Sequence, residues 1–118
     1  MKLLSFNCRG LASSHKKSSL KRLVASTRLD IMLLQENLGV KENVLRILVG
    51  ICPRWDFDAL DARGRSGGLA IGWNPRVCRC ENIWGFESSL GVDLFSEELG
   101  RMLTVINIYG PYLNRDSY

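Results

Sequence analysis

The apolar positions along the chain predict buried strands in alternation with amphipathic helices. In the clearest element, residues 30–37, four consecutive apolar residues lead into Gln35, Glu36 and Asn37. A continuous apolar run of this length is typical of a strand that is covered on both faces. Glu36 is therefore expected to emerge where the strand ends, although a short polar segment after a strand is more often an ordinary solvated loop.

A strand over residues 2–8 and a helix from Ser13 or Ser14 to about residue 28 precede this run. Serine is a good N-cap. The residues at helical spacing on the expected buried face of the helix are Leu20, Leu23, Val24 and Thr27. Strand, helix and strand in this order predict a parallel pair whose carboxyl ends share one sheet edge. Asn7 and Glu36 are then expected to be neighbours.

The remainder of the chain changes from a helical to a strand-like pattern. A second helix is expected over residues 40–49, with Gly50 as its end. Its apolar stripe consists of Val44, Ile47, Leu48 and Ile51. Beyond it, strands are expected over residues 55–60, 69–73, 77–86, 89–95 and 101–109, with turns at 62–68 and 97–100. Both faces of the last strand are largely apolar, which predicts a central position in a sheet.

Composition and charge narrow the class of protein. The 118 residues make at most one domain, and 46% apolar and 24% charged residues are ordinary for a soluble globular protein. The net charge of +4 permits a polyanionic partner without requiring one. The chain has no stretch long enough to span a bilayer and no signal peptide, so an intracellular protein is expected. The spacing of its cysteines does not fit zinc and favours reduced thiols: Cys8, Cys52, Cys78 and Cys80.

Basic residues gather on the polar face of the first expected helix. They are Lys16, Lys17, Lys21, Arg22 and Arg28. Such a row could meet a phosphate backbone. A solvated face is the commoner outcome, because helix surfaces are often rich in lysine and no aromatic residue is interleaved here for base stacking.

Four segments resemble, in order, the first motifs of the endonuclease/exonuclease/phosphatase superfamily. They are residues 5–11 (SFNCRGL), 30–37 (DIMLLQEN), 64–71 (GRSGGLAI) and 106–111 (INIYGP). The sequence of the first segment is most similar to the apurinic-endonuclease-like domain of plant LINE-type (non-LTR) retrotransposons. Their shared order across nearly the whole chain makes the match more specific than any single motif. Asn37 departs from the threonine that the family commonly has there.

The resemblance implies an α/β fold, namely the N-terminal half of a four-layer α/β sandwich (DNase I-like), with a mixed sheet and two helices on one face. It also implies phosphodiester hydrolysis with Mg²⁺ or Mn²⁺, and DNA as the partner. Asn7, Glu36 and Tyr109 are the catalytic residues that it implies, with Glu36 and Asn7 as metal ligands and Tyr109 at the scissile phosphate. These residue types suit metal-dependent phosphodiester hydrolysis, because Mg²⁺ prefers oxygen ligands and a phenol can donate a hydrogen bond to a phosphate oxygen.

The later motifs of the superfamily, a Gly-Asp-x-Asn and a Ser-Asp-His segment, do not occur in the sequence, and its one histidine, His15, precedes the first helix. We therefore expect residues 1–118 to form a single, C-terminally truncated domain. On its own this domain should be inactive and should bind metal weakly or not at all. If it is functional, we expect it in the nucleus. The alternative is a non-catalytic nucleic-acid-binding or protein-interaction module. Because the chain should supply mainly one of two sheets, an exposed sheet face is expected to favour self-association.

Overall fold

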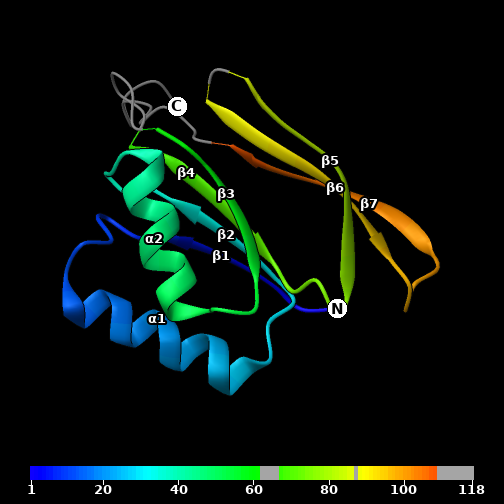
Figure 1. The fold of residues 1–118 in the computed structure, drawn as a ribbon, viewed down its shortest axis with the longest axis horizontal. Helices are drawn as coiled ribbons and strands as arrows, with labels where there is room; N and C mark the ends of the chain where they lie inside the picture. Colours follow the sequence, from blue (N-terminus) through cyan, green and yellow to red (C-terminus); the bar gives the residue numbers. More distant parts are fainter. Residues whose placement is uncertain (62–66, 87, 109–118) are drawn as a thin grey trace, which may run out of the picture.

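The fold has three layers: a pair of helices, a mixed sheet and an antiparallel sheet (Figure 1). The structure is a computed structural model, and it describes residues 1–61, 67–86 and 88–108. Both helices cover the same face of the first sheet, and the second sheet packs against its other face. The predicted α/β class, with a mixed sheet and two helices on one face, is confirmed.

The order of elements along the chain follows the expected alternation. The elements are β1 (Leu3–Asn7), α1 (Ser14–Thr27), β2 (Ile31–Gln35), α2 (Lys41–Ile51), β3 (Asp56–Leu60), β4 (Leu69–Trp73), β5 (Cys78–Phe86), β6 (Ser89–Ser96) and β7 (Arg101–Ile108). The first sheet has the order β1-β2-β4-β3, in which β1 and β2 are parallel and the other pairs antiparallel. The second sheet, β5-β6-β7, is antiparallel throughout.

Strand β2 lies between two hydrophobic cores. Met32 and Leu34 pack into the core beneath the helices. Ile31 and Leu33 pack into the core between the sheets. Because successive side chains of a strand point to opposite faces, a strand that is buried on both sides requires apolar residues at every position. This requirement explains the uninterrupted apolar run in the sequence.

Two expectations about the sheets are wrong. The chain supplies strands of both sheets, not mainly of one, and β7 lies at the edge of its sheet as described, not at the centre. The inward face of β7 packs on the first sheet, whereas its outward residues Met102, Ile106 and Ile108 are 48%, 46% and 63% exposed. An apolar pattern on both faces of a strand cannot reveal whether both faces are covered within the same chain.

Helix α2 does not end at Gly50 as predicted. It continues to Ile51, and the backbone N–H of the C-cap residue Cys52 donates to the Leu48 carbonyl at 2.8 Å. A Cβ atom built at Gly50 would have no atom within 4 Å. The packing of the described residues therefore gives no reason for a glycine at this position.

Replacement Gly50→Ala should stabilise the chain by about 0.5–1 kcal/mol, because alanine loses less backbone entropy in a helix. Urea denaturation would measure the change in the free energy of unfolding. Gly72→Ala is the matched control and should destabilise, because a Cβ there would overlap the Phe57 ring. An unchanged or lower stability of Gly50→Ala would contradict the expectation.

Candidate functional site

Two predicted site residues lie at one edge of the first sheet. Asn7, the last residue of β1, is paired in register with Gln35, the last residue of β2. Glu36 follows directly, and its carbonyl accepts a hydrogen bond from the Gly10 N–H at 2.7 Å. No hydrogen bond joins the side chains of Asn7 and Glu36 in the described part of the chain. The loops after β1 and β2, which we call the rim, are therefore joined through their backbones.

The side chain of Asn7 shapes the first loop of the rim. Its Oδ1 accepts a hydrogen bond from the Arg9 N–H at 3.1 Å, and Arg9 and Gly10 both have positive φ, at 49° and 94°. From α1, Lys16 Nζ donates to the carbonyls of Cys8 at 2.7 Å and Arg9 at 2.6 Å. Lys16 was expected to be a solvated cation on the helix surface. Instead, its hydrogen bonds join α1 to the loop after β1.

Glu36 is held through its backbone on two sides. Its N–H donates to the Gly68 carbonyl at 2.9 Å, and Gly10 bonds its carbonyl. The residue has a φ of 53°, a strained value for a non-glycine residue, and such strain concentrates at functional sites. A Cβ at Gly67 would come within 2.9 Å of the Glu36 Cα, so glycine is needed at position 67. The backbone of the half-buried Glu36 is thus set in one place by its neighbours.

A buried amide bonds the second sheet to the end of β2 and to β4. Asn107 of β7 is 1% exposed, and its Nδ2 donates to the carbonyls of Leu34 and Ala70, each at 2.9 Å. Its Oδ1 accepts from Gln35 Nε2 at 2.8 Å, and the same Nε2 donates to Ser5 Oγ at 3.1 Å. The last residues of β2 are therefore bonded across to β7 as well as along their own sheet.

Comparison with known proteins adds the family. A family model described as the endonuclease/exonuclease/phosphatase family matches residues 4–112. The chain belongs to this family. The comparison with curated protein sequences finds no significant match.

Solved structures share the fold at low sequence identity. The D. rerio TDP2 complex with a single-strand DNA product has a TM-score of 0.75 and 12% identity, over 98% of this chain and 48% of that one. An endonuclease/exonuclease/phosphatase from Bacteroides vulgatus has a TM-score of 0.71 and 14% identity, over 98% and 54%. The Xenopus laevis APE2 catalytic domain has a TM-score of 0.67 and 19% identity, over 98% and 47%. The chain thus spans about half of the length of these relatives.

The rim offers few metal ligands. In the ranges that the structure describes, no three His, Cys, Asp or Glu side chains are placed to hold a metal ion together. One carboxylate can suffice for Mg²⁺ where waters and a substrate phosphate complete the coordination. Glu36 fits that part, and the amide oxygen of Asn7 is already used once by Arg9. Among the described residues, the rim thus has one carboxylate and one partly used amide oxygen, and their role as metal ligands stays a prediction.

Sequence reasoning missed the amide of Asn107 as a structural element of the rim. The alternation along β7 placed Asn107 on the face of Leu103 and Val105, and a polar side chain among inward apolar ones is a signal of a buried hydrogen-bond network. The sequence places Gln35 at the end of the strand that leads to Glu36 and gives no sign of its bond to Asn107. Tyr109 and most of the turn at 62–68 lie outside the described residues, so the contact of Tyr109 with a phosphate stays a prediction. Neither described helix is long and apolar enough to cross a membrane.

Asn107→Leu should lower the free energy of unfolding by about 2–4 kcal/mol, because it leaves two buried carbonyls without their donor. Chemical denaturation would measure the loss. Thr104→Val on the exposed face of the same strand is the control. It removes only the exposed bond from Thr104 Oγ1 to Asp93 Oδ1 and should cost less than about 1 kcal/mol. Equal effects of the two changes would contradict the role of Asn107.

Burial raises the pKa of the Cys8 thiol from 9.0 to about 11, with a smaller opposing effect of Lys16. The unfolded thiol therefore loses its proton first, and the stability that the neutral thiol contributes should fall as the pH rises from about 9 to about 11. Cys8→Ala should flatten the decline in the free energy of unfolding over this range. Cys80→Ala, at a thiol that is only partly buried, should flatten it less. An unchanged slope in Cys8→Ala would count against a buried neutral thiol.

Proposed function

We propose that this chain is the N-terminal half of a divalent-metal-dependent phosphodiesterase domain that cleaves DNA and that derives from a LINE-type retrotransposon. The observation that carries the proposal is Glu36, strained at a φ of 53° and fixed between Gly10 and Gly68 at the end of a buried strand. A carboxylate set in this way suits a task that depends on position. The family match over residues 4–112 supports the class of reaction.

Each proposed site residue has a part that matches its chemistry. Glu36 would hold Mg²⁺ or Mn²⁺ through its carboxylate, and Asn7 would add a neutral oxygen ligand or orient the substrate without adding charge. Tyr109 would donate to a non-bridging oxygen of the scissile phosphate. The bound metal would stabilise the charge that builds up on the phosphoryl oxygens. Asn107 would act as a positioning residue, because it bonds Gln35 beside Glu36 and precedes Tyr109 by two positions.

DNA is the proposed substrate, and the rim is the proposed place of contact. The D. rerio TDP2 structure of similar fold holds a single-strand DNA product. The net charge of +4 favours a polyanion. The sequence of residues 5–11 supports the retrotransposon origin. A nuclear location would follow from a DNA substrate. Binding of DNA without hydrolysis is the second candidate, and it would rest on the same charge.

The remaining half of the domain would pack on the second sheet. The exposed apolar residues Met102, Ile106 and Ile108 form an outward face at an edge strand, and the relatives of similar fold have about twice the length of this chain. Exposed apolar faces and open strand edges associate readily with one another. We therefore propose that the chain associates with itself when nothing else covers β7.

Fusion of the C-terminal half of a plant LINE-type endonuclease after Tyr118 should give Mg²⁺-dependent nicking of a supercoiled plasmid, whereas the chain alone should give none. General-base catalysis, which the missing motifs would supply, contributes roughly 10²–10⁴-fold. In the fusion, Glu36→Gln should lower the rate by about 100-fold or more, because the amide lacks the anionic oxygen. Tyr109→Phe should raise the barrier by only about 1.5–3 kcal/mol.

Glu42→Gln is the matched control, because Glu42 is an exposed carboxylate in the first turn of α2. Its rate should equal that of the unmodified fusion. A folded fusion without activity, or an unchanged rate in Glu36→Gln, would show that the chain has the fold of the family without its chemistry. Nicking by the isolated chain that depends on Glu36 would show that this half is sufficient.

A further inference from the structure

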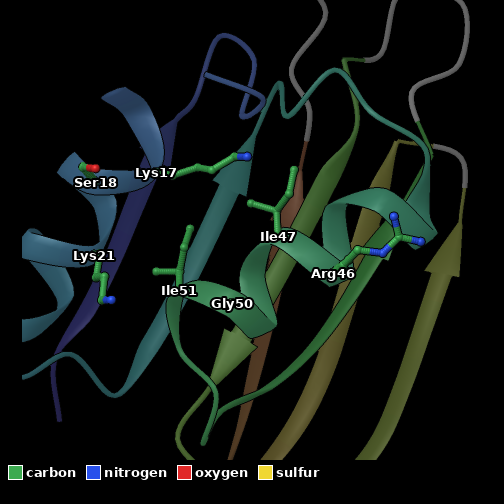
Figure 2. Close-up of a pocket in the computed structure, with 7 residues that line it drawn as sticks. All are labelled: Lys17, Ser18, Lys21, Arg46, Ile47, Gly50 and Ile51. Carbon is green, nitrogen blue, oxygen red and sulfur yellow. The ribbon is translucent and has the colours of Figure 1, made fainter. Parts of the chain in front are cut away.

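A groove runs between α1 and α2 on the helical layer. Three neighbouring hollows of about 540, 420 and 280 Å³ share lining residues, and we call them together the helix groove. The first and second share Lys17, Arg46 and Ile47, and the second and third share Lys21 and Ile51. Figure 2 shows the middle section, with α1 on one side and α2 on the other.

The helix groove has an aliphatic lining. Ile47 and Ile51 project from α2 into the space between the helices (Figure 2). Towards one end the lining includes Leu38 and Val44, and towards the other it includes Val24. The residues of α2 recur at helical spacing, so a single face of that helix lines the groove along its length. Val44 and Ile51 are buried in the core. The partly exposed Ile47 and Val24 and the exposed Leu38 would therefore make the apolar contacts with a ligand.

The charges along the groove are all of one sign. The described lining contains Lys17, Lys21, Arg46 and Arg54 and no acidic residue. The ion pairs found among the described residues involve other cations, namely the N-terminus, Lys41 and Arg79. In Figure 2, Lys17 extends from α1 towards α2, whereas the long side chain of Arg46 extends away from α1. These cations are thus available to a ligand.

Gly50 keeps the middle of the groove open. It lines the section in Figure 2, and its missing side chain would meet open space instead of protein atoms. Glycine inside a helix costs about 1 kcal/mol relative to alanine. The structure offers no packing reason for this cost, but a larger residue would stand in the helix groove.

We propose that the helix groove binds an acidic amphipathic helix of a partner protein. Such a helix would place aliphatic side chains on the partly exposed Ile47 and Val24 and carboxylates beside the flanking cations, which is the helix-in-groove mode of recognition. The 11 residues of α2 are about 16 Å long at 1.5 Å per residue, which matches about three turns of a bound helix. One end of the groove reaches the loop after β2 at Leu38, but the proposed peptide binding does not depend on the hydrolytic reaction.

Other polyanions fit the groove less well. A membrane surface is flat and would not reach the lining between two helices. A single strand of nucleic acid would use the cations, but its bases stack on aromatic side chains. Trp55, at one end, is the single aromatic residue in the described lining. An aliphatic floor between basic walls is best matched by leucine and glutamate on one helix.

The test uses a fluorescein-labelled model peptide of roughly 18 residues, long enough to form a helix on binding, with leucine on one face and glutamate on the flanks. Fluorescence anisotropy with the full chain should give saturable binding that weakens as salt is added. The double variant Lys17→Glu/Lys21→Glu should weaken binding by about tenfold or more. Arg22→Glu, an exposed charge reversal on α1 outside the groove lining, should change binding less than about twofold.

Gly50 supplies a second, uncharged test. Gly50→Leu should place a side chain in the groove and weaken the peptide by about tenfold, whereas Gly50→Ala should leave binding unchanged. Circular dichroism would check that each variant is folded. The Gly50 pair keeps the test decisive if the double charge reversal fails to fold.

Several outcomes would overturn the proposal. These are no binding of the peptide, equal binding by all variants, and equal binding of a peptide with lysine in place of glutamate. A labelled oligothymidylate that binds the chain and is lost in Lys17→Glu/Lys21→Glu, but not in Arg22→Glu, would assign the groove to nucleic acid instead. Vesicles of anionic lipid that give the same pattern would assign it to a membrane surface.

Discussion

The end of β2 is buried on both faces, and the backbone groups there must find their hydrogen-bond partners within the protein. The partners come from several segments. The Leu34 carbonyl accepts from the Asn107 amide, the Gln35 carbonyl from the Cys8 N–H, and the Glu36 carbonyl from the Gly10 N–H. The Glu36 N–H donates to Gly68. The rim thus exists because the loop after β1, the approach to β4 and the strand β7 converge on the end of one strand.

This convergence also explains the position of strain. Glu36 and Leu38 have φ values of 53° and 59°, and Arg9 in the facing loop has 49°. Each departs from the usual conformations of a non-glycine residue, and together they let the chain turn sharply within reach of neighbouring backbones. The cores on both sides of β2 stabilise the fold enough to hold these residues in place. The same packing that requires an apolar strand therefore sets the backbone of the acidic residue that follows it.

The sequence predicted the first sheet and its helices better than it predicted the rim. The apolar run before Gln35 has one physical interpretation, and Ser13 caps α1 as expected, accepting a hydrogen bond from the Lys16 N–H at 3.2 Å. The same chain order placed Asn7 and Glu36 at one edge. Asn107 could not be matched with Leu34 or Ala70, because the pairing spans two sheets and more than thirty positions along the chain. Whether the outer face of β7 is covered, and what Gly50 does, likewise depend on residues that are distant in the sequence. A local pattern cannot reveal them.

The need for glycine at position 67 has a consequence for how the sequence can change in evolution. Any Cβ at this position would come too close to the Glu36 backbone, so drift at position 67 would displace the acidic residue even where glutamate itself was retained. In homologous chains that are free from selection, this glycine would be replaced as readily as a residue on an exposed loop. Among such homologues, the residue at position 67 would therefore record whether selection still preserves the shape of the rim.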